Sequence, residues 1–124
     1  MIFANWIAGP HLIGLIFIIA GLIQKYYPPK EINSLYGYRT TQSMKNQQNW
    51  DEGNRYSTKL MIKCGIVLVI TGIILTSGMM LIPISPEWRT GIKVVLMLLC
   101  AFGSVAVLFR ATEKHLKLQF SDTL

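Results

Sequence analysis

The sequence predicts an all-α membrane protein with three transmembrane helices and a motif-bearing cytoplasmic loop between the first and the second. Apolar residues make up 52% of the 124 residues, whereas charged residues make up only 15%, well below the usual content of a soluble domain. The mean hydropathy is positive, at +0.41. The apolar residues are concentrated in three blocks, and one long polar segment separates the first block from the second. We therefore expect a single membrane domain over residues 1–124.

The first apolar block, residues 2–23, is expected to form the first span. At about 1.5 Å per residue it would reach roughly 33 Å as a helix, enough for a bilayer core of about 30 Å. No basic residue precedes the block and no A-x-A-like cleavage site follows it, which favours an uncleaved helix over a signal peptide. Pro10 lacks a backbone N–H, so the regular helix is expected to kink or begin there.

The second and third spans are predicted at residues 60–82 and 91–110. Between them Ser85 can cap a helix, Pro86 suits a first helical position and Glu87 suits the positive end of the helix dipole. Because the link is only a few residues long, these two helices are expected to form an antiparallel hairpin.

Basic residues predict the orientation. The loop at residues 24–59 carries Lys25, Lys30, Arg39, Lys45, Arg55 and Lys59, and the tail adds Arg110, Lys114 and Lys117. The positive-inside rule therefore places the loop and the C-terminus in the cytoplasm and the N-terminus outside. Anionic lipid headgroups account for the formal net charge of +6, and no nucleic-acid partner is expected.

Residues suited to catalysis or metal binding are sparse. Cys64 and Cys100 lie inside predicted spans, outside any C-x-x-C pattern, and are expected to pack as small apolar residues. No nucleophile has a neighbouring base, and Asp51 and Glu52 are adjacent, so a helix points them about 100° apart. We expect no metal, no cofactor and no enzymatic activity.

His11 is a polar, titratable residue within the first predicted span. One interpretation is that water or a carbonyl freed beside Pro10 satisfies it locally; the other gives it a pore, proton or ligand role. Small residues recur four positions apart and can let helices approach closely, within the chain or between copies. These pairs are Ala4 and Ala8, Asn5 and Gly9, and Gly72 and Thr76.

The polar segment at residues 33–54 is interpreted as the working surface, with the apolar helices as its scaffold. Gly37 suits a turn, and Thr40, Thr41 or Ser43 can cap a helix that begins near Gln42 and leads into the second span, with a bend at Gly53.

Polar residues and one tryptophan recur at three- and four-residue steps along this predicted helix: Ser43, Asn46 or Gln47, Trp50, Asn54 and Ser57. Trp50 is expected to anchor this face at the membrane interface or against the preceding loop. Arg39 is expected beside the helix's N-terminal amides, where it favours an anion: a lipid phosphate, a ligand carboxylate, or Asp51 or Glu52. The alternative is that Arg39 and Trp50 only hold the loop against the bilayer surface and the helix ends.

This polar segment resembles the motif of the SdpI-like family of bacterial integral membrane proteins. The shared feature is N-x-x-x-G-x-R-T, followed about ten residues later by tryptophan. The candidate binding residues are Asn33, Tyr36, Gly37, Arg39, Thr40, Ser43, Asn46, Trp50 and Asn54. The resemblance implies the bacterial cytoplasmic membrane and an immunity role, because the family is named after proteins that protect a producing cell from a membrane-active toxin peptide.

The leading functional hypothesis is therefore an immunity protein that binds a toxin peptide or the peptide's membrane target. One alternative is a homo-oligomeric transporter or channel subunit, with His11, Asn5 and the small residues lining or packing its path. Another is an adaptor that docks a partner protein through residues 36–50.

Overall fold

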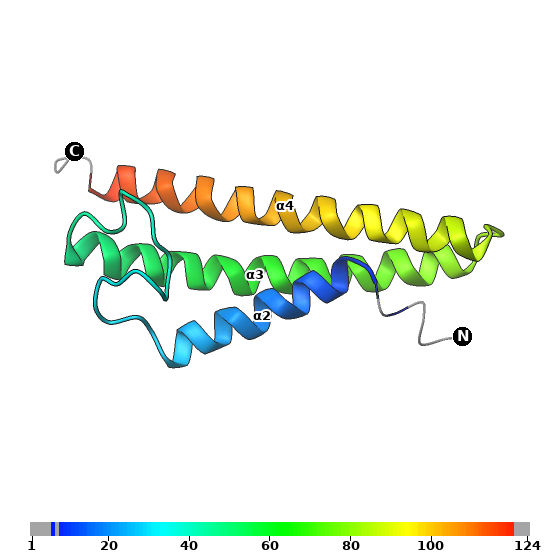
Figure 1. Cartoon of the computed structure of the whole chain (residues 1–124), viewed down its shortest axis with the longest axis horizontal. Coiled ribbons are helices and arrows are strands. Elements are labelled where there is room, and N and C mark those ends of the chain that lie inside the picture. Colours follow the sequence, from blue (N-terminus) through cyan, green and yellow to red (C-terminus); the bar gives the residue numbers. More distant parts are fainter. Residues whose placement is uncertain (1–5, 7, 121–124) are drawn as a thin grey trace.

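The structure, a computed structural model, describes Trp6 and residues 8–120. Three principal helices, α2 (Pro10–Tyr26), α3 (Gln47–Met80) and α4 (Pro86–Gln119), dominate this part of the chain, which contains no strand. Figure 1 shows α3 and α4 side by side as a long antiparallel hairpin, with α2 crossing α3 obliquely. The predicted all-helical class is confirmed.

Helices α3 and α4 are long and apolar enough to cross a membrane. Each has 34 residues and reaches roughly 51 Å, so both extend well beyond the predicted spans at residues 60–82 and 91–110. Helix α2 has 17 residues, fewer than the ~20 that usually span a bilayer. The predicted first span at residues 2–23 begins among residues outside those described, and the three-span arrangement stays a prediction.

Two helix starts agree with the sequence. Pro10 occupies the beginning of α2 directly after Gly9, whose φ of +146° suits a residue without a side chain. Pro10 therefore starts the described helix rather than kinking it. Before α4, the Ser85 hydroxyl accepts a hydrogen bond from the Trp88 backbone N–H at 3.5 Å, and Pro86 and Glu87 occupy the first turn as predicted.

The predicted start of the next helix was wrong. Helix α3 begins at Gln47, and the side chain of Asn46 caps it by accepting the backbone N–H of Asn49 at 2.8 Å. Residues 41–44 form turns, because the hydroxyls of Thr40 and Ser43 bond to nearby backbone N–H groups before the helix begins. The helix also continues without a break through Gly53, where a bend was expected.

Helices α2 and α3 pack through glycine. A Cβ atom added at Gly14 would lie 2.5 Å from the carbonyl oxygen of Gly65, and one at Gly72 would lie 2.2 Å from the backbone nitrogen of His11. We call Gly14, Gly21, Gly65 and Gly72 the glycine seam. Gly72 therefore permits close approach within the chain; of the other predicted small residues, Ala4 and Asn5 lie outside the described residues.

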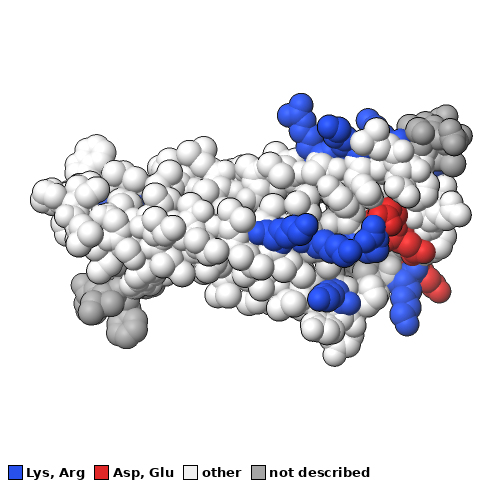
Figure 2. All heavy atoms as spheres, turned by 180° about the vertical axis from the view of Figure 1, so that it is seen from behind, with Lys and Arg blue, Asp and Glu red and all other residues white. Residues whose placement is uncertain are grey.

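Helix α4 buries far less of its surface than α3 does. Its buried residues are Lys93 near one end and Thr112 and Leu116 near the other. The apolar side chains between these positions are largely exposed, as expected for a surface that faces lipid. Figure 2 shows Lys and Arg gathered at one end of the molecule, with a long uncharged surface beyond them. The candidate site lies at the charged end.

Candidate functional site

Trp50 lies at the centre of the charged end. Its side chain is fully buried, and its indole N–H donates a hydrogen bond to the carbonyl oxygen of Pro29 at 2.7 Å. The bond ties the first turn of α3 to the segment that leaves α2. Trp50 is thus held against the preceding loop, one of the two positions expected for it. We call the loop at residues 27–46, the first turns of α3 (residues 47–57) and the end of α4 (residues 109–116) the polar cap.

Asn54 fixes the path of the loop one helical turn later. Its side-chain oxygen accepts the backbone N–H of Tyr38 at 2.6 Å, and its amide nitrogen donates to the carbonyl of Trp50 at 2.9 Å. Gly37 makes this approach feasible: its φ is +113°, and a Cβ atom there would lie 2.6 Å from the Asn54 oxygen. The two motif residues therefore depend on one another, because only glycine leaves room for the amide.

Thr40, Ser43 and Asn46 shape the turn that enters α3. The buried Ser43 hydroxyl donates to the carbonyl of Tyr38 at 3.0 Å and accepts the N–H of Thr40 at 2.8 Å. Asn46 then caps the helix. Five motif residues thus hold the cap in its folded shape, mainly through hydrogen bonds with its backbone. They are Gly37, Ser43, Asn46, Trp50 and Asn54.

Glu113, on α4, joins the last helix to the cap. One of its carboxylate oxygens accepts the Tyr38 phenol at 2.8 Å and the Thr40 hydroxyl at 2.5 Å. Burial raises the pKa of the Tyr38 phenol, and the nearby Glu113 carboxylate raises it further, so the phenol stays protonated and donates. Sequence reasoning missed Glu113, since no local pattern links it to a loop more than 70 residues earlier.

The remaining motif residues are more exposed. The Asn33 side chain accepts the backbone N–H groups of Leu35 and Tyr36 at 2.9 and 2.7 Å, forming a turn. The Tyr36 hydroxyl donates to the Tyr27 carbonyl at 2.6 Å. Arg39 is exposed, and its guanidinium donates to the Ser34 carbonyl. Arg39 also borders a cavity of about 230 Å³ that is lined by the loop and by residues of all three helices.

Arg39 bonds to neither of the two acidic residues considered for it. Asp51 accepts a hydrogen bond from the Gln47 side chain at 2.7 Å, and Glu52 pairs with Arg55 on the same helix. His115 on α4 also reaches Glu52, with its Nε2 atom 2.8 Å from a carboxylate oxygen, while its ring stacks on Tyr56 at 4.1 Å. The hydrogen bond from the Arg55 guanidinium lowers the pKa of Glu52, and His115 lowers it by a smaller amount. Partial burial acts in the opposite direction and raises it.

His11 lies far from the cap, near the start of α2. Its Nε2–H donates to the carbonyl of Trp6 at 2.8 Å, and the two rings meet edge to face at 5.5 Å. The structure does not bring His11 together with the motif residues. Its Nε2 atom is bonded within its own chain, whereas its buried Nδ1 atom has no hydrogen-bond partner among the described residues.

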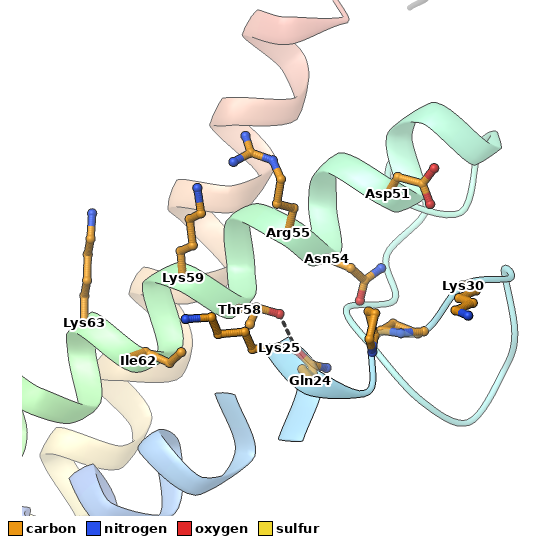
Figure 3. A pocket seen from close by; sticks show the side chains of 12 residues that line it. Gln24, Lys25, Lys30, Asp51, Asn54, Arg55, Thr58, Lys59, Ile62 and Lys63 are labelled. Carbon is orange, nitrogen blue, oxygen red and sulfur yellow. Dashed lines mark hydrogen bonds between the residues drawn. The ribbon is translucent and has the colours of Figure 1, made fainter. Parts of the chain in front are cut away.

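A groove of about 550 Å³ opens between the C-terminal end of α2 and the beginning of α3. Pro28, Pro29 and Ile62 give it apolar walls. Its basic residues are Lys25, Lys30, Arg55, Lys59 and Lys63, and Asp51 is its acidic one. Figure 3 shows Lys59 and Lys63 extending from α3 in one direction, with Gln24 and Lys25 at the facing end of α2. We call this cavity the basic groove.

The basic groove was not predicted, although the sequence carries a signal for half of it. Asp51, Arg55, Lys59 and Lys63 follow one another at four-residue steps and therefore share one face of α3. The other half depends on how α2 docks. There the Thr58 hydroxyl donates to the side-chain oxygen of Gln24 at 2.9 Å, joining the two helices at the groove.

Comparison with known proteins shows the family to which this chain belongs. A model of the SdpI/YfhL protein family matches residues 30–110, which include most of the cap and the greater part of the α3–α4 hairpin. The chain belongs to the SdpI/YfhL family. It is also 40% identical over 105 residues to "Uncharacterized protein YfhL" of Bacillus subtilis (strain 168), an alignment that covers 85% of this chain and 83% of that protein. No solved structure matches it. These matches confirm the resemblance that the motif suggested. In this member of the SdpI/YfhL family, the motif residues lie within the polar cap.

Proposed function

We propose that this protein is a multi-pass membrane protein of the immunity type, which protects its cell from a membrane-active peptide toxin by binding the peptide or the peptide's target. Membership of the SdpI/YfhL family is the observation that carries this proposal. Two helices long and apolar enough to cross a membrane support the membrane location.

The distribution of charge supports a placement in the bacterial cytoplasmic membrane. Lys and Arg gather at the cap end of the molecule (Figure 2). Arg89 and Lys93 lie in the first turns of α4, near the opposite end of the hairpin. The polar cap and the C-terminus accordingly face the cytoplasm and the N-terminus faces outward, with α2 contributing to a third span. The cap then contacts anionic headgroups of the inner leaflet.

In this proposal the exposed apolar sides of α3 and α4 supply the contact with a hydrophobic peptide or its target. The folded cap fixes the ends of the three helices relative to one another. Arg39 is the motif residue best placed for a directed contact, because its guanidinium is exposed and a cavity adjoins it.

The test is survival of cells challenged with a panel of hydrophobic and cationic membrane-active peptides. Expression of the protein is expected to raise survival against at least one of them, and Arg39→Ala is expected to reduce this protection at unchanged protein level. Lys45→Ala is the matched control, since it removes an exposed positive charge from the same loop. If the wild-type protein protects against no peptide, the proposal is wrong.

A second candidate, an adaptor that docks a partner protein through residues 36–50, is favoured by one observation directly before that segment. Leu35 is 90% exposed beside Tyr36, so the loop presents an apolar side chain that the described part of the chain does not cover. Purification of the wild type and of Leu35→Glu under mild conditions distinguishes the candidates. A stoichiometric partner lost only from the variant supports the adaptor, whereas protection without any partner supports immunity.

A further inference from the structure

The basic groove holds positive charge that the protein itself does not neutralise. Arg55 is paired with Glu52, and Asp51 accepts a hydrogen bond from Gln47. The ammonium groups of Lys59 and Lys63, in contrast, make no hydrogen bond or ion pair with the residues that the structure describes. These two side chains lie one turn apart on α3, close enough for both to reach one anion.

The groove is also suited to an apolar group. Its volume of about 550 Å³ lies within the range of ligand pockets, about 300–1,000 Å³. Pro28, Pro29 and Ile62 form walls that a free, fully hydrated anion would not use. Positive charge beside apolar walls matches an amphiphile with an anionic head and a hydrocarbon chain.

The position of the groove indicates where such an amphiphile would come from. Lys59 directly precedes the apolar stretch of α3, and Lys63 lies one turn inside it. On the facing helix, the apolar run of α2 ends at Ile23, just before Gln24 and Lys25. The groove therefore lies where the apolar surface meets the polar cap, the level at which a bilayer presents its phosphates, and lysine side chains can extend toward that level.

We propose that the basic groove binds the phosphate of an anionic glycerophospholipid, with Lys59 and Lys63 donating to the phosphate oxygens. Ile62, which packs against Gly21 on the apolar side of Lys59, contacts the glycerol and the first methylene groups of the acyl chains. Pro28 and Pro29, level with Trp50, border the headgroup on its cytoplasmic side. The inference depends on the membrane placement given under the proposed function, but not on the immunity role.

The experiment uses the full chain in neutral detergent micelles, with Trp6→Phe and Trp88→Phe so that Trp50 is the one remaining tryptophan. Trp50 is bonded to Pro29, a wall of the groove, so a nitroxide-labelled phosphatidylglycerol bound there will quench its fluorescence. Titration is expected to show saturable quenching by phosphatidylglycerol and much weaker quenching by equally labelled phosphatidylcholine.

Charge variants test the residues. Lys59→Gln with Lys63→Gln is expected to weaken phosphatidylglycerol binding about 25-fold, from about fivefold for each basic residue near a headgroup. Lys114→Gln with Lys117→Gln removes the same charge from α4 outside the groove and is expected to change binding far less, because exposed charges distant from the bound phosphate are screened. Lys59→Arg with Lys63→Arg retains the charge and is expected to retain binding, which separates loss of contact from loss of fold.

Three results would overturn the inference. If both Gln double variants bind phosphatidylglycerol equally weakly, the lipid is attracted by the overall positive charge of the protein and not by a defined site. Equal affinity for phosphatidylcholine would remove the selectivity for an anion. Displacement of the labelled lipid by glycerol 1-phosphate or inorganic phosphate as effectively as by unlabelled phosphatidylglycerol would show that no lipid chain is recognised. Because binding is measured without any toxin, failed protection in cells leaves this result standing, and failed lipid binding leaves the immunity proposal standing.

Discussion

The glycine seam and the polar cap join the helices through different interactions: the seam through close backbone packing of α2 on α3, and the cap through hydrogen bonds among the loop, α3 and α4. In the seam, the backbones of α2 and α3 meet at Gly14, Gly65 and Gly72, and fit depends on the absence of side chains. In the cap, the loop and α4 are held by directed hydrogen bonds to side chains such as Asn54 and Glu113. Shape complementarity therefore suffices where the surroundings are apolar, whereas the solvated end needs specific polar partners to fix one arrangement.

Breaking the cap at Trp50 is expected to have the largest effect. Trp50→Ala removes a fully buried ring and its bond to Pro29, and should lower the free energy of unfolding by about 3–5 kcal/mol. Thermal unfolding in detergent, followed by circular dichroism, measures the loss. Trp88→Ala is the control, because that ring is 71% exposed and its removal should cost little. Similar losses in both variants would contradict the central position given to Trp50.

Adding a side chain within the glycine seam is expected to have the second-largest effect on stability. Gly72→Ala forces a methyl group to within 2.2 Å of the His11 backbone nitrogen, which should destabilise the protein by about 2–3 kcal/mol despite the better helix propensity of alanine. Gly103→Ala on α4 is the matched control, because its Cβ would meet nothing within 4 Å. An equally stable Gly72→Ala would show that the two backbones do not meet as described.

Releasing α4 from the cap is expected to have an intermediate effect. Glu113→Ala leaves the Tyr38 and Thr40 hydroxyls without their shared acceptor, at a cost of about 1–2 kcal/mol. Spin labels on the loop and on the end of α4 should report a broader distance distribution in this variant. Lys114→Ala, an exposed neighbour on α4, should leave the distribution unchanged; broadening in both would point to a general loosening of the helix end.

The smallest expected effect is a pH dependence from Glu52. Its pKa in the folded state is lowered by Arg55 and His115, so the stability it contributes is present above its ordinary value of 4.5 and is lost as the pH falls through the lower folded value. Arg55 is half exposed, so the contribution should not exceed about 1 kcal/mol. Melting temperatures between pH 7 and pH 3 should therefore fall less steeply in Glu52→Gln than in the wild type. Parallel curves for the two proteins would exclude this coupling.

Much of the fold could be predicted because hydropathy and helix caps are local signals. Pro10 and the Ser85–Glu87 turn mark helix starts that the structure confirms. The start of α3 was misplaced, because several Ser, Thr and Asn residues within a short segment can each serve as a cap. Their hydrogen bonds with the folded loop, to Tyr38 and to one another, decide that Asn46 takes the role.

Long-range partners could not be predicted in the same way. The motif named Asn54 and Gly37, but their direct contact depends on the loop folding back onto α3. Glu113 was missed because its position depends on the register of α4 against the cap. The seam did leave a signal in the sequence, since Gly14 and Gly21, like Gly65 and Gly72, lie seven residues apart on one helical face, a spacing that the predicted four-residue pairs do not include.

The hydrogen bonds of the cap also imply an order of assembly during translation. Trp50, Asn54, Gly37 and Pro29 all lie within the first 54 residues, so the bonds among them can form while the ribosome is still producing the hairpin. The hydroxyls of Tyr38 and Thr40 must wait for the carboxylate of Glu113, which is added to the chain more than 70 residues later. A nascent chain stalled before that residue would carry a half-built cap, with two hydroxyl groups still bonded to water.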